Sequence, residues 1–185
     1  MPISHRLKMP AFLACAAVLG MAPLAAHAQD AVSDAEENQA LADTRNACAQ
    51  QDFHTFLQYY IGSAAVRQRH TAPQVEQRSF AQPQKAGRAI AAADMPLFRV
   101  GQLDWNYADA ASLKQWEANP DQRYQLLDVT FTELPGGGRK VVYQPGVFHD
   151  DGEGDSMTLV RRTGKPAAYV FGWQNGCWQL TQDLR

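Results

Sequence analysis

The sequence predicts an α+β fold, with N-terminal helices packed on a curved antiparallel sheet that ends in a C-terminal β-meander. Apolar residues recur at helical spacing mainly before residue 70, whereas apolar and polar residues alternate from residue 123 onward. Near the end, Asn175-Gly176 is the dipeptide that most strongly indicates a two-residue hairpin, because a type I′ turn needs positive φ at both positions. Helices followed by strands are typical of helices covering one face of a sheet.

Three helices are predicted before the sheet. Ser33 and Glu36 fit a capping box, which would start a helix that runs to about Ala49. Asp52 can cap a second helix that stops at Gly62, and Ser63 can cap a short third one. The second helix carries an apolar stripe that is interpreted as core, made of Phe53, Phe56, Leu57, Tyr60 and Ile61.

The middle of the chain has a less regular pattern. Residues 81–93 are polar and then alanine-rich, and they predict no element. Asn119-Pro120 ends a helix that carries Leu113 and Trp116. The elements predicted here are strands at 73–80, 97–100 and 103–107 and a helix at 108–118.

The meander begins with a strand at 123–134, in which Leu127, Val129 and Phe131 share one face and Asp128 lies on the other. The predicted elements that follow are a loop at 135–138, a strand at 140–144, a polar loop at 145–154 and a strand at 155–162.

The last hairpin takes its register from the Asn175-Gly176 turn. The aromatic residues of its two strands share one face with Leu180, so the rest of the chain must cover that face, and Cys177 points to the opposite face. The predicted cross-strand pairs are Gln174–Cys177, Trp173–Trp178, Phe171–Leu180 and Tyr169–Gln182.

Residues 1–28 have the pattern of a secretory signal peptide. A basic start with Arg6 and Lys8 precedes an apolar run, and Ala26-His-Ala28 fits the cleavage site. The run is shorter than the roughly 20 apolar residues of a membrane span, and Cys15 lies too early in it for a lipoprotein. We therefore expect cleavage near Ala28, one domain over 29–185, no membrane span, and a periplasmic or secreted location.

Cysteine usage agrees with export. Cleavage would remove Cys15 and leave Cys48 and Cys177, and an even number of cysteines in an oxidising compartment predicts a disulfide between them. A catalytic or metal-binding thiol is the alternative, but the sequence has no C-x-x-C motif and no Cys/His cluster.

Charge and motifs exclude several functional classes. The chain has 17 basic and 19 acidic residues, which disfavours nucleic acid and anionic lipid as partners. It lacks the motifs of common serine hydrolases, zinc proteases and nucleotide-binding proteins, and no cofactor is predicted. Arg67, Arg69, Arg78 and Arg88 are interpreted as ordinary surface arginines.

Two groups of residues are candidates for chemistry. The loop from His149 to Asp155 is rich in carboxylates, and Asp151, Glu153 and Asp155 are its metal-ligand candidates. Its spacing does not match a known calcium loop, so a solvated hairpin loop is the favoured interpretation.

Asp104, Asp128 and His149 are the catalytic candidates, because a carboxylate in an apolar cavity can become a general base. For Asp128 this requires its strand face to be the concave one. A solvated or hydrogen-bonded Asp128 on the outer face is the favoured alternative.

The order of elements resembles the NTF2-like (cystatin-like) superfamily. The resemblance spans about Asp52 to Leu180, and it rests on the run Asp52-Phe-His-Thr-Phe-Leu57, the strand around Val75 and the closing Gly172-to-Leu180 hairpin. It implies a strongly curved sheet around helices with a cone-shaped cavity, and it carries over no catalytic residue. Some members are enzymes, many only bind, and many dimerise through the sheet, so a homodimer stays open.

The favoured functional hypothesis is an exported, non-catalytic binding domain of unknown ligand, which holds a small apolar molecule or a protein partner. An envelope protein-interaction or inhibitor-type protein is the first alternative, which would use the loops at 135–138 and 149–155. A small hydrolase or isomerase with Asp128 or Asp104 as base is the second.

Overall fold

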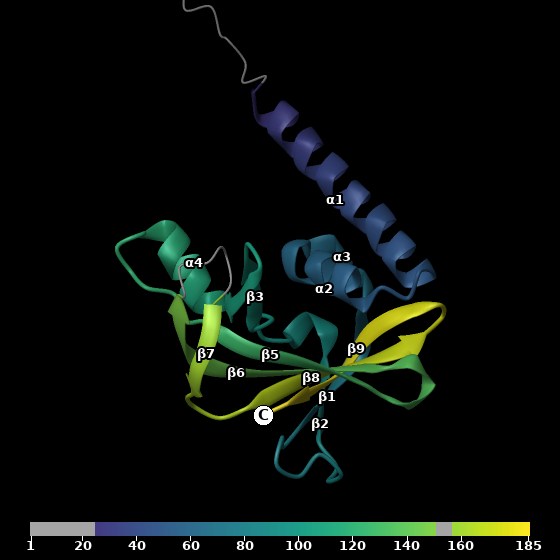
Figure 1. Ribbon diagram of the computed structural model, residues 1–185. Coiled ribbons are helices and arrows are strands. Elements are labelled where there is room, and N and C mark those ends of the chain that lie inside the picture. The colour runs from purple at the N-terminus through teal and green to yellow at the C-terminus, as the bar shows by residue number, and fades with distance from the viewer. Residues whose placement is uncertain (1–24, 151–156) are drawn as a thin grey trace, which may run out of the picture.

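The computed structural model describes residues 25–150 and 157–185 (Figure 1). Most of the predicted signal peptide and the metal candidates Asp151, Glu153 and Asp155 lie outside the described residues. The architecture is α+β, as predicted, with three N-terminal helices followed by a curved, mostly antiparallel sheet.

The three N-terminal helices are α1 (Ala25–Ala49), α2 (Phe53–Gly62) and α3 (Ala64–Arg69). Asp52 and Ser63 cap α2 and α3 as predicted, since their side chains accept hydrogen bonds from the backbone N–H groups of Thr55 and Val66. The predicted helix start at Ser33 is wrong, because α1 begins at Ala25 and continues through that position. The N-terminal part of α1 projects away from the sheet (Figure 1).

The main sheet has the strand order β2-β1-β9-β8-β6-β5, with β7 paired to β6. Strands β1 and β9 are parallel, and the other pairs are antiparallel. The strands are β1 (Thr71–Arg78), β2 (Arg88–Ala91), β5 (Leu127–Glu133), β6 (Arg139–Asp150), β7 (Met157–Arg162), β8 (Ala167–Gln174) and β9 (Cys177–Leu184).

Strand β6 is longer than predicted and runs through Pro145 to Asp150, where a loop was expected. Pro145 has no N–H to donate, but its carbonyl accepts from Thr163, and the N–H of Gly146 donates to Leu126. The part of β6 before Pro145 pairs with β8, and the part after Pro145 pairs with β7. Strands β7 and β8 therefore occupy successive stretches of β6.

The final hairpin confirms the predicted turn. Asn175 and Gly176 have φ values of 51° and 78°, and Trp173 pairs with Trp178 as expected. A bulge after Leu180 shifts the far end, so Tyr169 pairs with Asp183 and not with Gln182. The shift leaves Asp183 fully buried beside Tyr169.

The region between β1 and β5 holds the elements that were hardest to predict. It contains β2, a short 3₁₀ helix η1 (Ala92–Asp94) and a separate hairpin of β3 (Val100–Leu103) and β4 (Asn106–Asp109). Helix α4 (Ala110–Ala118) matches its prediction closely and leads into β5. Beyond this region, a 3₁₀ turn η2 (Pro135–Gly137) connects β5 to β6. The strand predicted at 97–100 is wrong except for its last residue.

The core lies between α2 and the sheet. The Phe53 ring contacts Trp178 and Phe171 at centroid distances of 5.1 and 5.5 Å, and Phe56 is fully buried against the same two side chains. Strand β5 contributes Leu127, Val129 and Phe131, as the alternation predicted. The aromatic face of the last hairpin is therefore covered mainly by α2.

Candidate functional site

A cavity of about 490 Å³ lies near the C-terminal end of α2. This volume falls within the range of small-molecule sites, which is about 300–1,000 Å³. The lining is mostly apolar, and its members are Tyr60, Arg67, Gln68, Thr71, Ala92, Ala93, Met95, Pro96, Leu97, Phe98, Tyr169 and Leu180.

One wall of the cavity is the segment from Ala92 to Phe98, which the sheet holds through Tyr169. The Phe98 and Tyr169 rings stack with their centroids 4.2 Å apart. The Tyr169 hydroxyl also accepts a 3.0 Å hydrogen bond from the backbone N–H of Arg99. The wall is thus fixed at its Phe98 end, while Leu97 keeps 60% of its surface exposed at the cavity.

The polar edge of the cavity is a chain of hydroxyl groups. The Thr71 hydroxyl donates to the carbonyl of Arg67 at 2.7 Å, so its proton is already committed. The Tyr60 hydroxyl lies 2.7 Å from Thr71 Oγ1 and must therefore be the donor in that contact. The proton of Tyr60 is held inside the wall, and only its oxygen lone pairs remain for another group.

Arg67 is the one charged side chain among the described residues that line the cavity. Its Nη1 donates to the carbonyls of Tyr60 and Ile61 at 3.2 and 2.6 Å, near the end of α2 where carbonyls lack helical partners. No ion pair with Arg67 occurs within the described residues. The Nε and Nη2 groups have no hydrogen-bond partner there either.

Burial keeps the tyrosine hydroxyls of the cavity neutral. Desolvation raises the pKa of Tyr60 to about 12, although the hydrogen bond with Thr71 and the charge of Arg67 oppose the shift. Desolvation also raises the pKa of Tyr169 well above its usual value. Both groups stay protonated near neutral pH, so they serve as hydrogen-bonding groups and not as bases.

An ion pair between a buried aspartate and an exposed arginine lies next to Tyr169. Asp183 is fully buried, and its Oδ2 accepts from Nε and Nη2 of Arg185 at 2.8 and 2.7 Å. Asp183 Oδ1 has no hydrogen-bond partner among the described residues. Neither Asp183 nor Arg185 lines the cavity, so we assign this ion pair to the packing of the sheet.

The catalytic candidates lie on three different elements, and none of them lines the cavity. Asp104 is exposed in the two-residue turn between β3 and β4, with a φ of 51°. Asp128 lies on the face of β5 that points away from the helices, where it pairs with Arg162 of β7 at 2.6 Å. His149 lies on β6 opposite Thr158.

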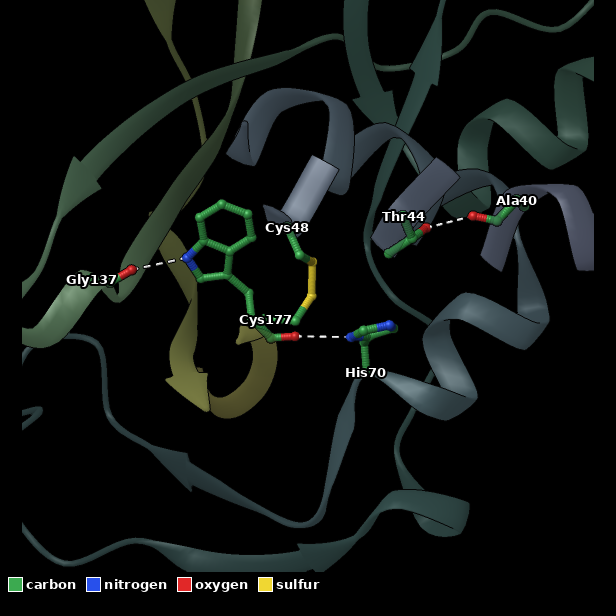
Figure 2. Close-up of a disulfide and its surroundings, with 7 residues drawn as sticks. Ala40, Thr44, Cys48, His70, Gly137 and Cys177 are labelled. Carbon is green, nitrogen blue, oxygen red and sulfur yellow. Dashed lines mark hydrogen bonds between the residues drawn. A yellow bond between two sulfur atoms is a disulfide. The ribbon is translucent and has the colours of Figure 1, made fainter. Parts of the chain in front are cut away.

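The predicted disulfide joins Cys48 at the end of α1 to Cys177 beside the hairpin turn, with the Cα atoms 4.9 Å apart (Figure 2). His70 lies next to it, and its Nδ1 is 3.1 Å from the carbonyl oxygen of Trp178. A carbonyl only accepts, so Nδ1 carries the proton and Nε2 is an acceptor, which has no partner in the described part of the chain. Burial lowers the pKa of His70.

No family model matches the chain, and neither the curated proteins nor the solved structures include a significant match. Across the described residues, no group of three or more His, Cys, Asp or Glu side chains is arranged to hold a metal ion. In that same part of the chain, no helix combines the length and the apolar character that a membrane crossing requires.

Sequence patterns do not predict the cavity. Tyr60 lies in the core, as predicted, and also lines the cavity. Arg67 is predicted as an ordinary surface arginine and residues 81–93 predict no element, yet Arg67, Ala92 and Ala93 line the cavity. No local signal identifies Arg67 as a lining residue, because its position depends on how the Ala92-to-Phe98 wall crosses the sheet.

Proposed function

We propose that this protein is an exported, non-catalytic binding protein that holds a small apolar molecule in the cavity between α2, α3 and the Ala92-to-Phe98 wall. The observation that carries the proposal is the cavity itself, which has an apolar lining and a short polar edge. Such a combination is typical of ligand sites, because apolar contacts supply affinity and a few polar groups set orientation.

The chemistry of the lining supports binding without turnover. A general acid or base works best when its pKa is near the working pH. Tyr60 and Tyr169 have pKa values raised far from neutrality, and Asp104, Asp128 and His149 do not line the cavity.

Export is the second part of the proposal. The pattern of residues 1–28 and the Cys48–Cys177 disulfide both favour an oxidising compartment. We also propose a relationship to the NTF2-like superfamily, which the curved sheet, the helices on its face and the partly open cavity beside them support.

A fluorescence titration with N-phenyl-1-naphthylamine, an apolar probe that brightens out of water, tests the proposal. We expect saturable binding of one probe per chain. Ala93→Trp, which fills part of the cavity, should weaken binding at least about tenfold, which is about 1.4 kcal/mol.

Ala118→Trp is the matched control. Ala118 is exposed at the end of α4 and does not line the cavity, so this variant should bind like the wild type. Probe binding that is absent, or that Ala93→Trp leaves unchanged, would contradict the proposal.

A further inference from the structure

Beside the Tyr60 and Thr71 hydroxyls, the polar edge of the cavity includes one cation, Arg67, whose hydrogen-bonding capacity is only partly used. A guanidinium has five N–H donors, and those of Nε and Nη2 lie along one edge that matches a carboxylate. In Arg67 the hydrogen bonds to Tyr60 and Ile61 use Nη1 alone. They hold the side chain in place and leave the carboxylate-matching edge without a partner in the described structure.

The other groups near Arg67 do not compete for that edge. The lining contains no acidic residue among those the structure describes. The charge of Arg67 helps to lower the pKa of Glu37, so this carboxylate lies within electrostatic range. Glu37 instead accepts hydrogen bonds from the Ser63 hydroxyl and from the N–H groups of Ala64 and Ala65 at the start of α3. Tyr60 gives its proton to Thr71, so it cannot substitute for Arg67 as a donor without breaking that contact.

We infer that the cavity selects an apolar monocarboxylate, with its carboxylate on the Nε–Nη2 edge of Arg67 and its apolar body against Met95, Leu97 and Phe98. This inference rests on the proposed function and adds the chemical class of the ligand. A charged pair at a partly desolvated cavity edge is stronger than one in open water. A bidentate arginine–carboxylate contact also fixes the orientation of the ligand.

The test compares decanoate with decan-1-ol, which has the same chain length and no charge. Each is titrated by calorimetry and by displacement of N-phenyl-1-naphthylamine. We expect wild-type protein to bind decanoate about tenfold more tightly than decan-1-ol. Because Arg67 is only partly buried, the preference should shrink as salt is added.

Arg67→Met should remove the preference and leave decan-1-ol binding close to the wild-type value. Arg69→Gln is its matched control, since Arg69 is an exposed arginine of the same helix that does not line this cavity. It should retain the full preference. Far-UV circular dichroism checks that each variant is folded.

Leu97→Glu keeps the test decisive if Arg67→Met does not fold, because Arg67 also holds the end of α2. Leu97 is 60% exposed, so a charge there is compatible with folding. Both ligands lose the apolar contact with Leu97, but only decanoate is repelled by the new carboxylate, so the preference for decanoate over decan-1-ol should fall about fivefold or more.

The outcomes separate this inference from the proposed function. Equal wild-type affinity for decanoate and decan-1-ol would overturn the inference and leave the binding function intact. A preference that persists in folded Arg67→Met, or that Leu97→Glu does not reduce, would also overturn it. Failure of both compounds and of the naphthylamine probe to bind would overturn the proposed function as well.

Discussion

The two ends of helix α2 serve different purposes. At its start, Phe53 packs against Trp178 and Phe171, close to the Cys48–Cys177 disulfide. At its end, Tyr60 packs against Phe98 on one side and lines a cavity on the other. The packed end, as we call the region around Phe53, Trp178 and the disulfide, provides stability. The open end, around Tyr60, Arg67 and the cavity, is available for a ligand.

The difference follows from what covers the sheet at each end. At the packed end, the start of α2 covers the sheet and the Cys48–Cys177 disulfide ties α1 to β9. Trp178 also donates its indole N–H to the carbonyl of Gly137 at 2.9 Å (Figure 2). The open end is covered by an irregular segment with one 3₁₀ turn, which cannot fill the space as a regular helix would. Substitutions at the packed end should therefore change stability, and those at the open end should change binding.

Trp178→Ala should have the largest effect on stability. The side chain is 1% exposed, and truncating it removes ring contacts with Phe53, Phe56 and Trp173. We expect a loss of about 3–5 kcal/mol in the free energy of unfolding, measured by urea denaturation. Trp105→Ala is the control, because Trp105 is 77% exposed, and it should cost less than about 0.5 kcal/mol. Similar losses in both variants would show that the packed end does not dominate stability.

Removal of the disulfide should rank second. The bond closes a loop with a sequence separation of 129, and its loss should cost about 2–5 kcal/mol. The Cys48→Ser, Cys177→Ser double variant and reduced wild-type protein should have similar denaturation midpoints. The variant should also be insensitive to reductant. A double variant as stable as the oxidised wild type would refute a stabilising role for the bond.

Acidification should weaken the packed end through His70. Because burial lowers the pKa of folded His70, protonation favours the unfolded state. Stability is complete above the unfolded pKa of about 6.5 and falls below it, by up to about 1.4 kcal/mol per pH unit. His70→Asn should unfold with a shallower dependence on pH between 7 and 5. If its pH dependence matches that of the wild type, other groups govern the loss.

Asp128→Asn should have the smallest effect. Its ion pair with Arg162 lies on the outer face of the sheet, and the Arg162 side chain is 56% exposed. We expect a loss below about 1 kcal/mol and unchanged binding of N-phenyl-1-naphthylamine. A large loss of binding in this variant would show that the ligand binds near Asp128 and not in the cavity, and that Asp128 is a functional residue.

Local chemistry made the packed end predictable from sequence. The Asn175-Gly176 turn, the alternation around Phe171 and Trp178, and the Asp52 cap each act within a few residues, and each is confirmed. The Cys48–Cys177 pair was also predicted, because only two cysteines remain after the expected cleavage.

The open end depends on contacts between distant residues, so sequence patterns could not reveal it. The wall is held by Tyr169, about 70 residues from Phe98, through ring stacking and the Arg99 N–H. The bulge that pairs Tyr169 with Asp183 and the continuation of β6 past Pro145 were missed for the same reason. Each is decided by the partner strand and not by the local run of residues.

Native mass spectrometry of the protein, purified from an oxidising compartment without reductant, shows whether the cavity holds a small molecule. The same spectrum reports whether the signal peptide is removed, whether the disulfide is formed, and the oligomeric state. We expect one small molecule per chain, either retained on purification or taken up when decanoate is added, and lost in Ala93→Trp. A wild-type chain that carries no molecule and takes up neither decanoate nor N-phenyl-1-naphthylamine would contradict this expectation.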